Sequence, residues 1–141
     1  MTTDSAWSTD RRHLAGPALR AFFRIARKWD LSADEERCLL GVPARSTYYR
    51  WRREHRGRLS SDAMERISCV IGIYGALHTI FQDGKQADSW IKRPNAAALF
   101  SGQTALHLMM GGQVTGLRAV RLYLDGQVEP DSPLQPDARC S

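Results

Sequence analysis

Residues 32–54 decide the fold, and they read SADEERCLLGVPARSTYYRWRRE. Ser32 and Glu35 form a capping box, because the serine oxygen and the glutamate carboxylate accept hydrogen bonds from the free N–H groups of a helix start. Gly41 ends this short helix, and the proline two residues later prevents its continuation. A second helix then runs from about Arg45 to Glu54. Two short helices joined by a tight turn are typical of a helix-turn-helix unit.

The two faces of this unit differ in chemistry. The apolar side chains are expected to pack inward, and they are Leu39, Leu40, Val42, Tyr48 and Trp51. Polar side chains near the start of the second helix point outward, where a recognition helix meets base edges in the major groove. We therefore predict DNA contacts from Arg45, Ser46, Thr47, Tyr49, Arg50 and Arg53. A basic helical hairpin that binds nothing is the alternative.

The charge distribution agrees with a polyanionic partner for the first half. The chain of 141 residues carries a formal net charge of +5. Up to Leu59 there are 13 Lys and Arg against 7 Asp and Glu, and from Ser60 onward there are 7 against 8. Nearly all of the excess is arginine, the cation best suited to bidentate contacts with phosphate and guanine. A solvated surface face is the other interpretation.

The remaining segments also show helical spacing. Pro17 suits the first turn of a helix, and the residues expected on its inner side are Leu19, Phe22, Phe23, Ala26 and Trp29. Asp62 and Glu65 form a second capping pair, opening a longer helix to about Phe81. One apolar stripe runs along that helix and is either a core face or a dimer interface. It consists of Met64, Ile67, Ile71, Tyr74, His78 and Phe81.

The second half continues in the same pattern. Shorter helices are expected near residues 87–91 and 105–109, and a final one runs from about Thr115 to Asp125, where Gly126 stops it. The polar segment that follows contains three prolines and predicts a flexible tail. No convincing alternating segment is present, so the sequence predicts an all-α fold.

The residues of catalytic and metal sites are scattered. Cys38, Cys69 and Cys140 lack the paired spacing of a zinc site, and His78 is interpreted as a hydrogen-bonded core histidine instead of a ligand. No stretch reaches the roughly 20 apolar residues of a membrane span. We predict a cytoplasmic protein that is not an enzyme and uses no metal or cofactor.

A family resemblance begins at Leu39. The segments LLGVPARSTYYRWRRE, LSSDAMERISCVIGIYGALHTIF, WIKRPNAAALF and GGQVTGLRAVRLYLDG resemble the Xre/MbcA/ParS family of bacterial antitoxins in order and spacing. The second half makes the match specific, because a tryptophan, Pro94-Asn95 and a loop with Phe100 lead into the Val-Arg-x-Tyr-Leu helix. The resemblance covers about Leu31 to Gly126.

The resemblance implies a partner and a domain order. Members of this family neutralise a co-expressed RES-domain toxin that uses NAD, obstruct its NAD-binding cleft with their C-terminal part, and repress their own operon with the toxin. The implied partners are thus a RES-domain toxin, operator DNA and a second copy of the chain, without a membrane. The expected regions are a flexible N-terminus (1–15), a helix-turn-helix region (16–60), a connecting and dimerisation helix (61–83), a toxin-binding domain (84–127) and a flexible tail (128–141).

The resemblance also assigns the toxin-binding residues. They are Trp90, Asn95, Phe100, Arg121, Tyr123, Leu124, Gln127, Val128 and Glu129. As single residues, Trp90 and Phe100 are better explained as core residues, and Arg121 as a surface residue. The chain departs from many relatives after Gly126, where an acidic tail replaces an arginine and a glycine pair. That tail either mimics NAD phosphates through its carboxylates or does nothing. A stand-alone dimeric helix-turn-helix repressor is the competing function.

Overall fold

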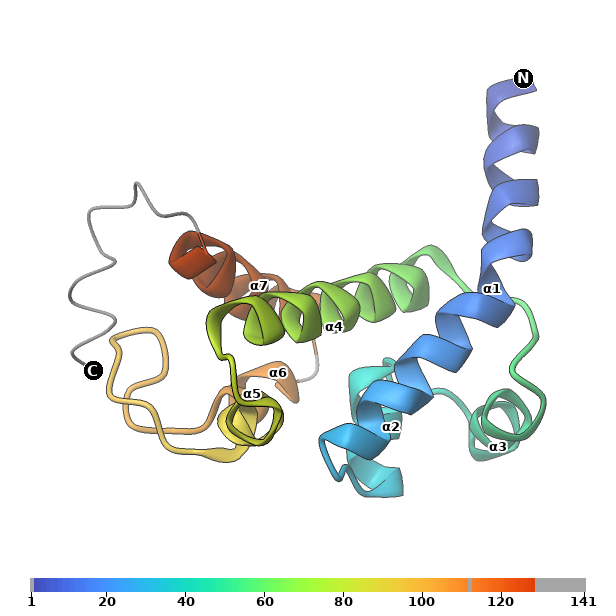
Figure 1. Cartoon of the computed structure of the whole chain (residues 1–141). Helices are drawn as coiled ribbons and strands as arrows, with labels where there is room; N and C mark the ends of the chain where they lie inside the picture. Colours follow the sequence, from blue (N-terminus) through green and yellow to red (C-terminus); the bar gives the residue numbers. More distant parts are fainter. Residues whose placement is uncertain (1, 112, 129–141) are drawn as a thin grey trace. The chain divides into compact units, whose positions relative to one another are not determined.

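The computed structural model describes residues 2–111 and 113–128, and the side chains of residues 15–111 and 113–128. Within these ranges the chain forms seven α-helices and one short 3-10 helix, with no strand (Figure 1). The all-α prediction is therefore confirmed. None of the described helices is both long enough and apolar enough to span a membrane. Contacts divide the chain into two compact units, Met1–Ser68 and Cys69–Ser141.

The first unit contains α1 (Thr2–Lys28), α2 (Ala33–Leu39), α3 (Arg45–Glu54) and the start of α4 (Ser61–Ile80). The predicted inner side of α1 is confirmed, since each of its five residues is at most 7% exposed. The helix begins at Thr2, however, and Pro17 lies inside it instead of at its start. The mobility of residues 1–15 stays a prediction.

The ends of α2 are fixed as the sequence predicts. The Ser32 hydroxyl oxygen accepts from the Glu35 N–H at 3.1 Å, and the Glu35 carboxylate accepts from the Ser32 N–H at 2.8 Å. At the other end Gly41 has a φ of +93°, the left-handed conformation that glycine adopts without strain. The helix-turn-helix prediction from local signals is thus confirmed, including the bounds of α3.

The start of α4 differs from the prediction. Ser60, and not Asp62, caps the helix, because its hydroxyl oxygen accepts from the Ala63 N–H at 3.0 Å. The Asp62 carboxylate instead pairs with the Arg66 guanidinium at 2.7 Å on the same helix. The serine stands one position before the first helical residue, which is where a capping side chain reaches the free N–H groups.

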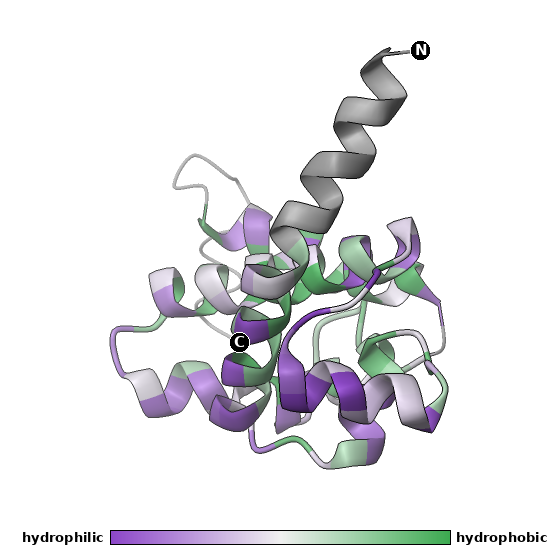
Figure 2. Ribbon diagram, turned by 90° about the vertical axis from the view of Figure 1, so that its right-hand side faces the viewer, coloured by the Kyte–Doolittle hydropathy of each residue, from purple (hydrophilic) through white to green (hydrophobic). Residues whose placement is uncertain are grey.

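The buried face of α4 is offset from the predicted stripe. Ile71 is 39% exposed and His78 is also exposed, whereas the buried residues of the helix include Ala63, Ile67, Val70, Ile73 and Leu77. Both series have helical spacing, and hydrophobic and hydrophilic residues alternate along the helices of the chain (Figure 2). The series without polar atoms is buried, because His78 and Tyr74 keep their polar groups near water. As a core face the predicted stripe is therefore wrong in register, although it shares Ile67 with the buried face. Its alternative use as a dimer interface stays a prediction.

The second unit contains the rest of α4, followed by α5 (Gly84–Ser89), the 3-10 helix η1 (Trp90–Lys92), α6 (Ala105–Met109) and α7 (Val114–Val128). The last helix continues past Gly126, so the predicted stop at that glycine is wrong. The adjoining tail residues 129–141 lie outside the described residues.

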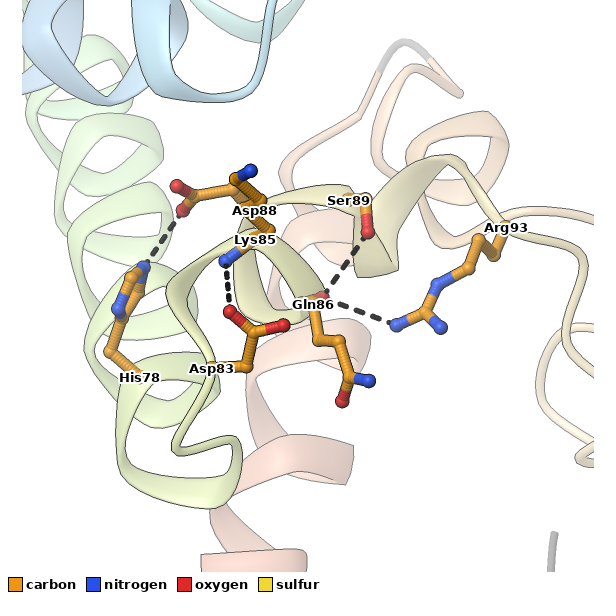
Figure 3. A network of polar contacts seen from close by, with 7 residues as sticks. All are labelled: His78, Asp83, Lys85, Gln86, Asp88, Ser89 and Arg93. Atoms are coloured by element: carbon orange, nitrogen blue, oxygen red, sulfur yellow. Dashed lines mark hydrogen bonds and ion pairs between the residues drawn. The ribbon is translucent and has the colours of Figure 1, made fainter.

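Polar contacts close the corner between α4 and α5 (Figure 3). His78 Nε2 lies 2.8 Å from Asp88 Oδ1, and the Tyr74 ring lies 4.3 Å from the His78 ring. Asp83 caps α5 by accepting a hydrogen bond from the Lys85 N–H at 3.2 Å. The prediction of a hydrogen-bonded histidine is confirmed, but its side chain is exposed instead of buried in the core.

Candidate functional sites

The helix α3 presents one polar face to solvent. Five of its six predicted DNA-contacting residues are exposed, namely Arg45, Ser46, Tyr49, Arg50 and Arg53, and Thr47 is half-buried. No acidic residue lies in the first turn of the helix. Within the described part of the chain, the one ion pair of these residues is a loose, exposed one between Arg53 and Glu54 at 3.7 Å. A pair of that kind contributes little, so the face is available to an anionic partner.

The opposite face of α3 is anchored to α2 through a buried polar contact. Tyr48 is fully buried and Trp51 is 5% exposed, as predicted. The Tyr48 hydroxyl donates a hydrogen bond to the Glu36 carboxylate, which is itself only 6% exposed. Burial, then the hydrogen bond and charge of Glu36, raise the pKa of Tyr48 well above its ordinary value. The contact fixes the rotation of α3 about its axis, and so decides which side chains face outward.

The turn between α2 and α3 is held from two sides. The Gly41 N–H donates to the Cys38 carbonyl at 3.1 Å, and the Val42 N–H donates to the Arg37 carbonyl at 2.8 Å. These are the two hydrogen bonds of a Schellman motif. The Arg37 guanidinium also donates to the Pro43 carbonyl at 2.8 Å and 3.2 Å. These bonds make the turn a fixed platform at the start of α3.

The exposure and backbone conformation of Val42, in this turn, differ from what the sequence predicts. Val42 was expected to pack inward, but it is 59% exposed and has a φ of +56°. In a Schellman motif the residue after the glycine often packs on the helix residue whose carbonyl it bonds. Here that residue is Arg37, whose side chain is polar, and Val42 stays exposed. A branched residue that follows Gly and precedes Pro at a helix end is the sequence signal that identifies such an exposed position.

The second unit is built around three aromatic rings. Phe100, at 3% exposure, meets Trp90 edge-on at 5.7 Å and Tyr123 edge-on at 5.2 Å between ring centroids. The Trp90 and Tyr123 rings are nearly parallel, with centroids 6.4 Å apart. Burial raises the pKa of Tyr123. The cluster joins η1, the loop before α6, and α7, so it supports the shape of the unit.

The loop that carries Phe100 is closed by its own backbone. The Asn95 N–H donates to the Gln103 carbonyl at 3.0 Å, and the Gly102 N–H donates to the Asn95 carbonyl at 2.9 Å. The Asn95 side-chain oxygen accepts from the Ala97 N–H at 2.9 Å, which forms an Asx turn. Asn95 therefore shapes the loop.

The exposed side of α7 contains the residues most accessible to a protein partner. Arg121 is half-buried, lies over Gly72 of α4, and has a loose pair with Asp125 at 3.9 Å. Leu122 is 71% exposed and was not among the predicted contacts. Leu122 is out of step with the buried series Leu117, Val120 and Leu124 on the same helix, and this spacing is the sequence signal that would have identified it.

The other predicted toxin contacts have mixed positions. Leu124 is 2% exposed, so it supports α7 from the core and does not offer its side chain to a partner. Gln127 is half-buried and Val128 is 37% exposed in the last turn of α7. Glu129 lies outside the described residues. Among the described residues no group of His, Cys, Asp and Glu side chains is arranged to hold a metal ion.

Comparisons with known proteins cover both units. Residues 10–72 match the antitoxin Xre-like helix-turn-helix domain, and residues 76–127 match the antitoxin Xre/MbcA/ParS C-terminal toxin-binding domain. A relative from Sinorhizobium fredii (strain NBRC 101917 / NGR234), named "Uncharacterized protein y4oB", is 46% identical over 109 residues, 77% of this chain and 82% of the relative. Both matched domains belong to antitoxins, and their junction lies in α4, as does the boundary between the two units. The chain belongs to the Xre/MbcA/ParS family of antitoxins, with a helix-turn-helix domain followed by a toxin-binding domain.

Proposed function

We propose that this antitoxin belongs to a type II toxin–antitoxin pair and neutralises a RES-domain toxin by covering its NAD-binding active site. The observation that carries the proposal is the toxin-binding domain matched over residues 76–127. It coincides with a unit that has its own aromatic core and an exposed helix. The RES toxin as the target follows from the family resemblance of the sequence.

The proposed mechanism is steric. Covering an active site requires buried area and a few anchoring side chains, and arginine and aromatic residues most often supply the anchors. Arg121 and Leu122 are accessible on α7, and Trp90 and Tyr123 are half-buried beside it. Phe100 and Leu124 would act indirectly, by holding the helix in place. Gln127, Val128 and Glu129 would approach the NAD cleft at the end of α7.

We further propose that α3 binds operator DNA as part of a homodimer and represses the chain's own operon. Paired half-sites one helical turn apart match a two-fold protein. The exposed stripe of α4 around Ile71 is the proposed dimer contact. Such a protein would act in the cytoplasm, where the operator and NAD are both present.

Co-expression with the product of the adjacent gene tests the toxin-binding proposal. We expect the two proteins to co-purify, and NAD in the cells to be maintained only when this chain is present. Leu122→Asp is expected to abolish co-purification, because it places a charge in the proposed interface. Leu99→Asp is the matched control, since Leu99 is also exposed in the second unit but belongs to the loop before α6 and not to α7. Failure to co-purify and unchanged NAD would overturn the proposal.

A stand-alone dimeric repressor is the second candidate. The match over residues 10–72 and the exposed arginines of α3 favour it equally well, because neither depends on a toxin. The same co-expression distinguishes the two functions. A chain that binds DNA upstream of its own gene but retains no toxin would be such a repressor.

A further inference from the structure

We propose that Val42 is a specificity-determining residue of the DNA interface, and that it contacts the 5-methyl group of a thymine in the major groove. The inference rests on the proposed function of α3 in binding DNA. It assigns a base-reading role to a residue outside α3, in the turn that precedes it. It also names the chemical group that is read.

The first step is the exposure of the side chain. Val42 is 59% exposed, which makes it the most exposed large apolar residue of the described part of the first unit. It lies three residues before Arg45, at the end of α3 that meets base edges in a helix-turn-helix protein. The exposed residues around it on this end are Ala44, Arg45 and Ser46, and the arginine and serine suit phosphates and guanine. Val42 has the largest aliphatic side chain among them.

The second step is the conformation of the backbone. Val42 has a φ of +56°, a region that β-branched residues rarely adopt because the side chain meets the backbone. Glycine or asparagine would occupy this position without strain. Neither burial nor backbone geometry therefore explains a valine here. Strained residues of this kind concentrate at functional sites.

The third step is the rigidity of the platform. The Schellman bonds and the Arg37 guanidinium fix the backbone on both sides of Val42. From the other direction, the ion pair of Arg66 and Asp62 packs against Gly41: a Cβ at that glycine would lie 3.1 Å from the nearest atom of each. A backbone held in this way fixes the direction of the Val42 Cα–Cβ bond, and recognition of a single methyl group requires such a fixed direction.

The fourth step is the choice of ligand. Of the four bases, only thymine presents an apolar group in the major groove, and small aliphatic side chains contact it. Cytosine and adenine present amino groups and guanine presents acceptors, none of which a valine satisfies. The isopropyl group of Val42 thus fits a thymine and disfavours the other three bases at the same position.

Base-analogue binding measurements test this assignment. The full-length chain selects its preferred duplex from a random-sequence pool, and each thymine of that duplex is then replaced in turn by deoxyuridine, which lacks only the 5-methyl group. We expect one thymine in each half-site whose replacement weakens binding by about fourfold, the ratio for one buried methyl group. Val42→Gly, which accepts the left-handed backbone, is expected to bind the thymine and deoxyuridine duplexes equally.

The controls separate this inference from the proposed function. Leu122→Ala removes an exposed leucine from the second unit and is expected to retain the fourfold ratio. A wild-type chain that binds its duplex tightly but is insensitive to every deoxyuridine would overturn the role of Val42 and leave DNA binding intact. The same holds if Val42→Gly keeps the fourfold ratio. A chain that selects no duplex at all would overturn DNA binding itself, and this inference with it.

Discussion

Both units of this antitoxin contain clustered aromatic rings, but among the described residues only the first unit buries charged side chains. In the first unit Glu36 accepts from Tyr48 and Arg66 pairs with Asp62, and both Glu36 and Arg66 are buried. In the second unit three aromatic rings join η1, the loop before α6, and α7. A buried hydrogen bond fixes the rotation of a helix, which the proposed contact of α3 with base edges requires. The packing of rings and aliphatic side chains supports the surface that we propose for toxin binding.

The largest effect is expected from the aromatic cluster. Phe100→Ala removes a ring that is 3% exposed, and it should lower the free energy of unfolding of the second unit by about 3–5 kcal/mol. Leu99→Ala is the matched control. The Leu99 side chain, next to Phe100 in the sequence, is 39% exposed, so its removal should cost less than about 1 kcal/mol. Urea unfolding followed by circular dichroism measures both. Similar losses for the two variants would contradict the assignment of Phe100 to the core.

A smaller loss is expected in the first unit when the buried hydrogen bond is removed. Tyr48→Phe leaves the Glu36 carboxylate without its phenolic donor, which should cost about 1–3 kcal/mol of unfolding free energy. Tyr49→Phe removes the same hydroxyl from a ring that is 43% exposed, and should change stability by less than about 0.5 kcal/mol. If Tyr48→Phe were as mild as Tyr49→Phe, the contact would not anchor α3.

The same tyrosine gives the first unit a sensitivity to alkali. The pKa of Tyr48 in the folded chain lies above the ordinary value of 10.0, chiefly because of burial and then because of Glu36. The folded state therefore holds the phenolic proton more tightly than the unfolded state. Its contribution to stability is complete below about pH 10 and is lost as the pH rises further. Tyr48→Phe is expected to flatten this alkaline decline in urea unfolding measured between pH 8 and pH 11.

The helix-turn-helix could be predicted from the sequence because its signals are local. The capping box at Ser32, the glycine at position 41 and the proline after it each act within a few residues, and they gave α2 and α3 closely. The outward face of α3 followed from the same spacing. The exposure of the arginines on this face could be predicted because charged side chains are rarely buried without a partner.

The predictions that were wrong concern features that depend on packing or on competing local signals. The buried face of α4 is selected between two apolar series by its neighbours, so Ile71 was misplaced. Gly126 was read as a stop, yet it does not adopt a positive φ and α7 continues through it to Val128. Leu124 looked like a contact residue and is core, whereas Leu122 is the exposed one. Local spacing gives the periodicity of a helix without stating which side meets the core.

Two glycines on α7 give a matched pair that tests close packing in the second unit. A Cβ at Gly116 would lie 2.3 Å from the Leu108 carbonyl oxygen, a backbone atom that cannot move aside by rotation. Gly116→Ala should therefore cost about 1–3 kcal/mol of unfolding free energy. Gly126→Ala meets no described atom within 4 Å and should stabilise α7 by up to about 1 kcal/mol. Thermal unfolding shifts of the same sign for both variants would contradict this packing.

The smallest effect on stability, and the sharpest contrast in function, is expected on the exposed face of α3. Arg45→Ala and Arg53→Ala should each change unfolding free energy by less than about 0.5 kcal/mol, since both side chains are exposed. Arg45→Ala should lose about 1–3 kcal/mol of discrimination between the selected duplex and a mismatched one, because we propose that Arg45 reads base edges.

Arg53 lies near the other end of α3, where phosphates are the nearer target. Arg53→Ala should weaken all duplexes alike and lower the slope of log affinity against log salt concentration by about one. Fluorescence anisotropy at several salt concentrations measures both quantities on the same samples. If Arg53→Ala instead left the salt slope unchanged and lost discrimination, the roles of the two arginines would be exchanged. That result would mean that α3 lies in the groove with its C-terminal end toward the bases. Because Tyr48 fixes the rotation of α3 but not its tilt in the groove, this pair of variants is what determines that orientation.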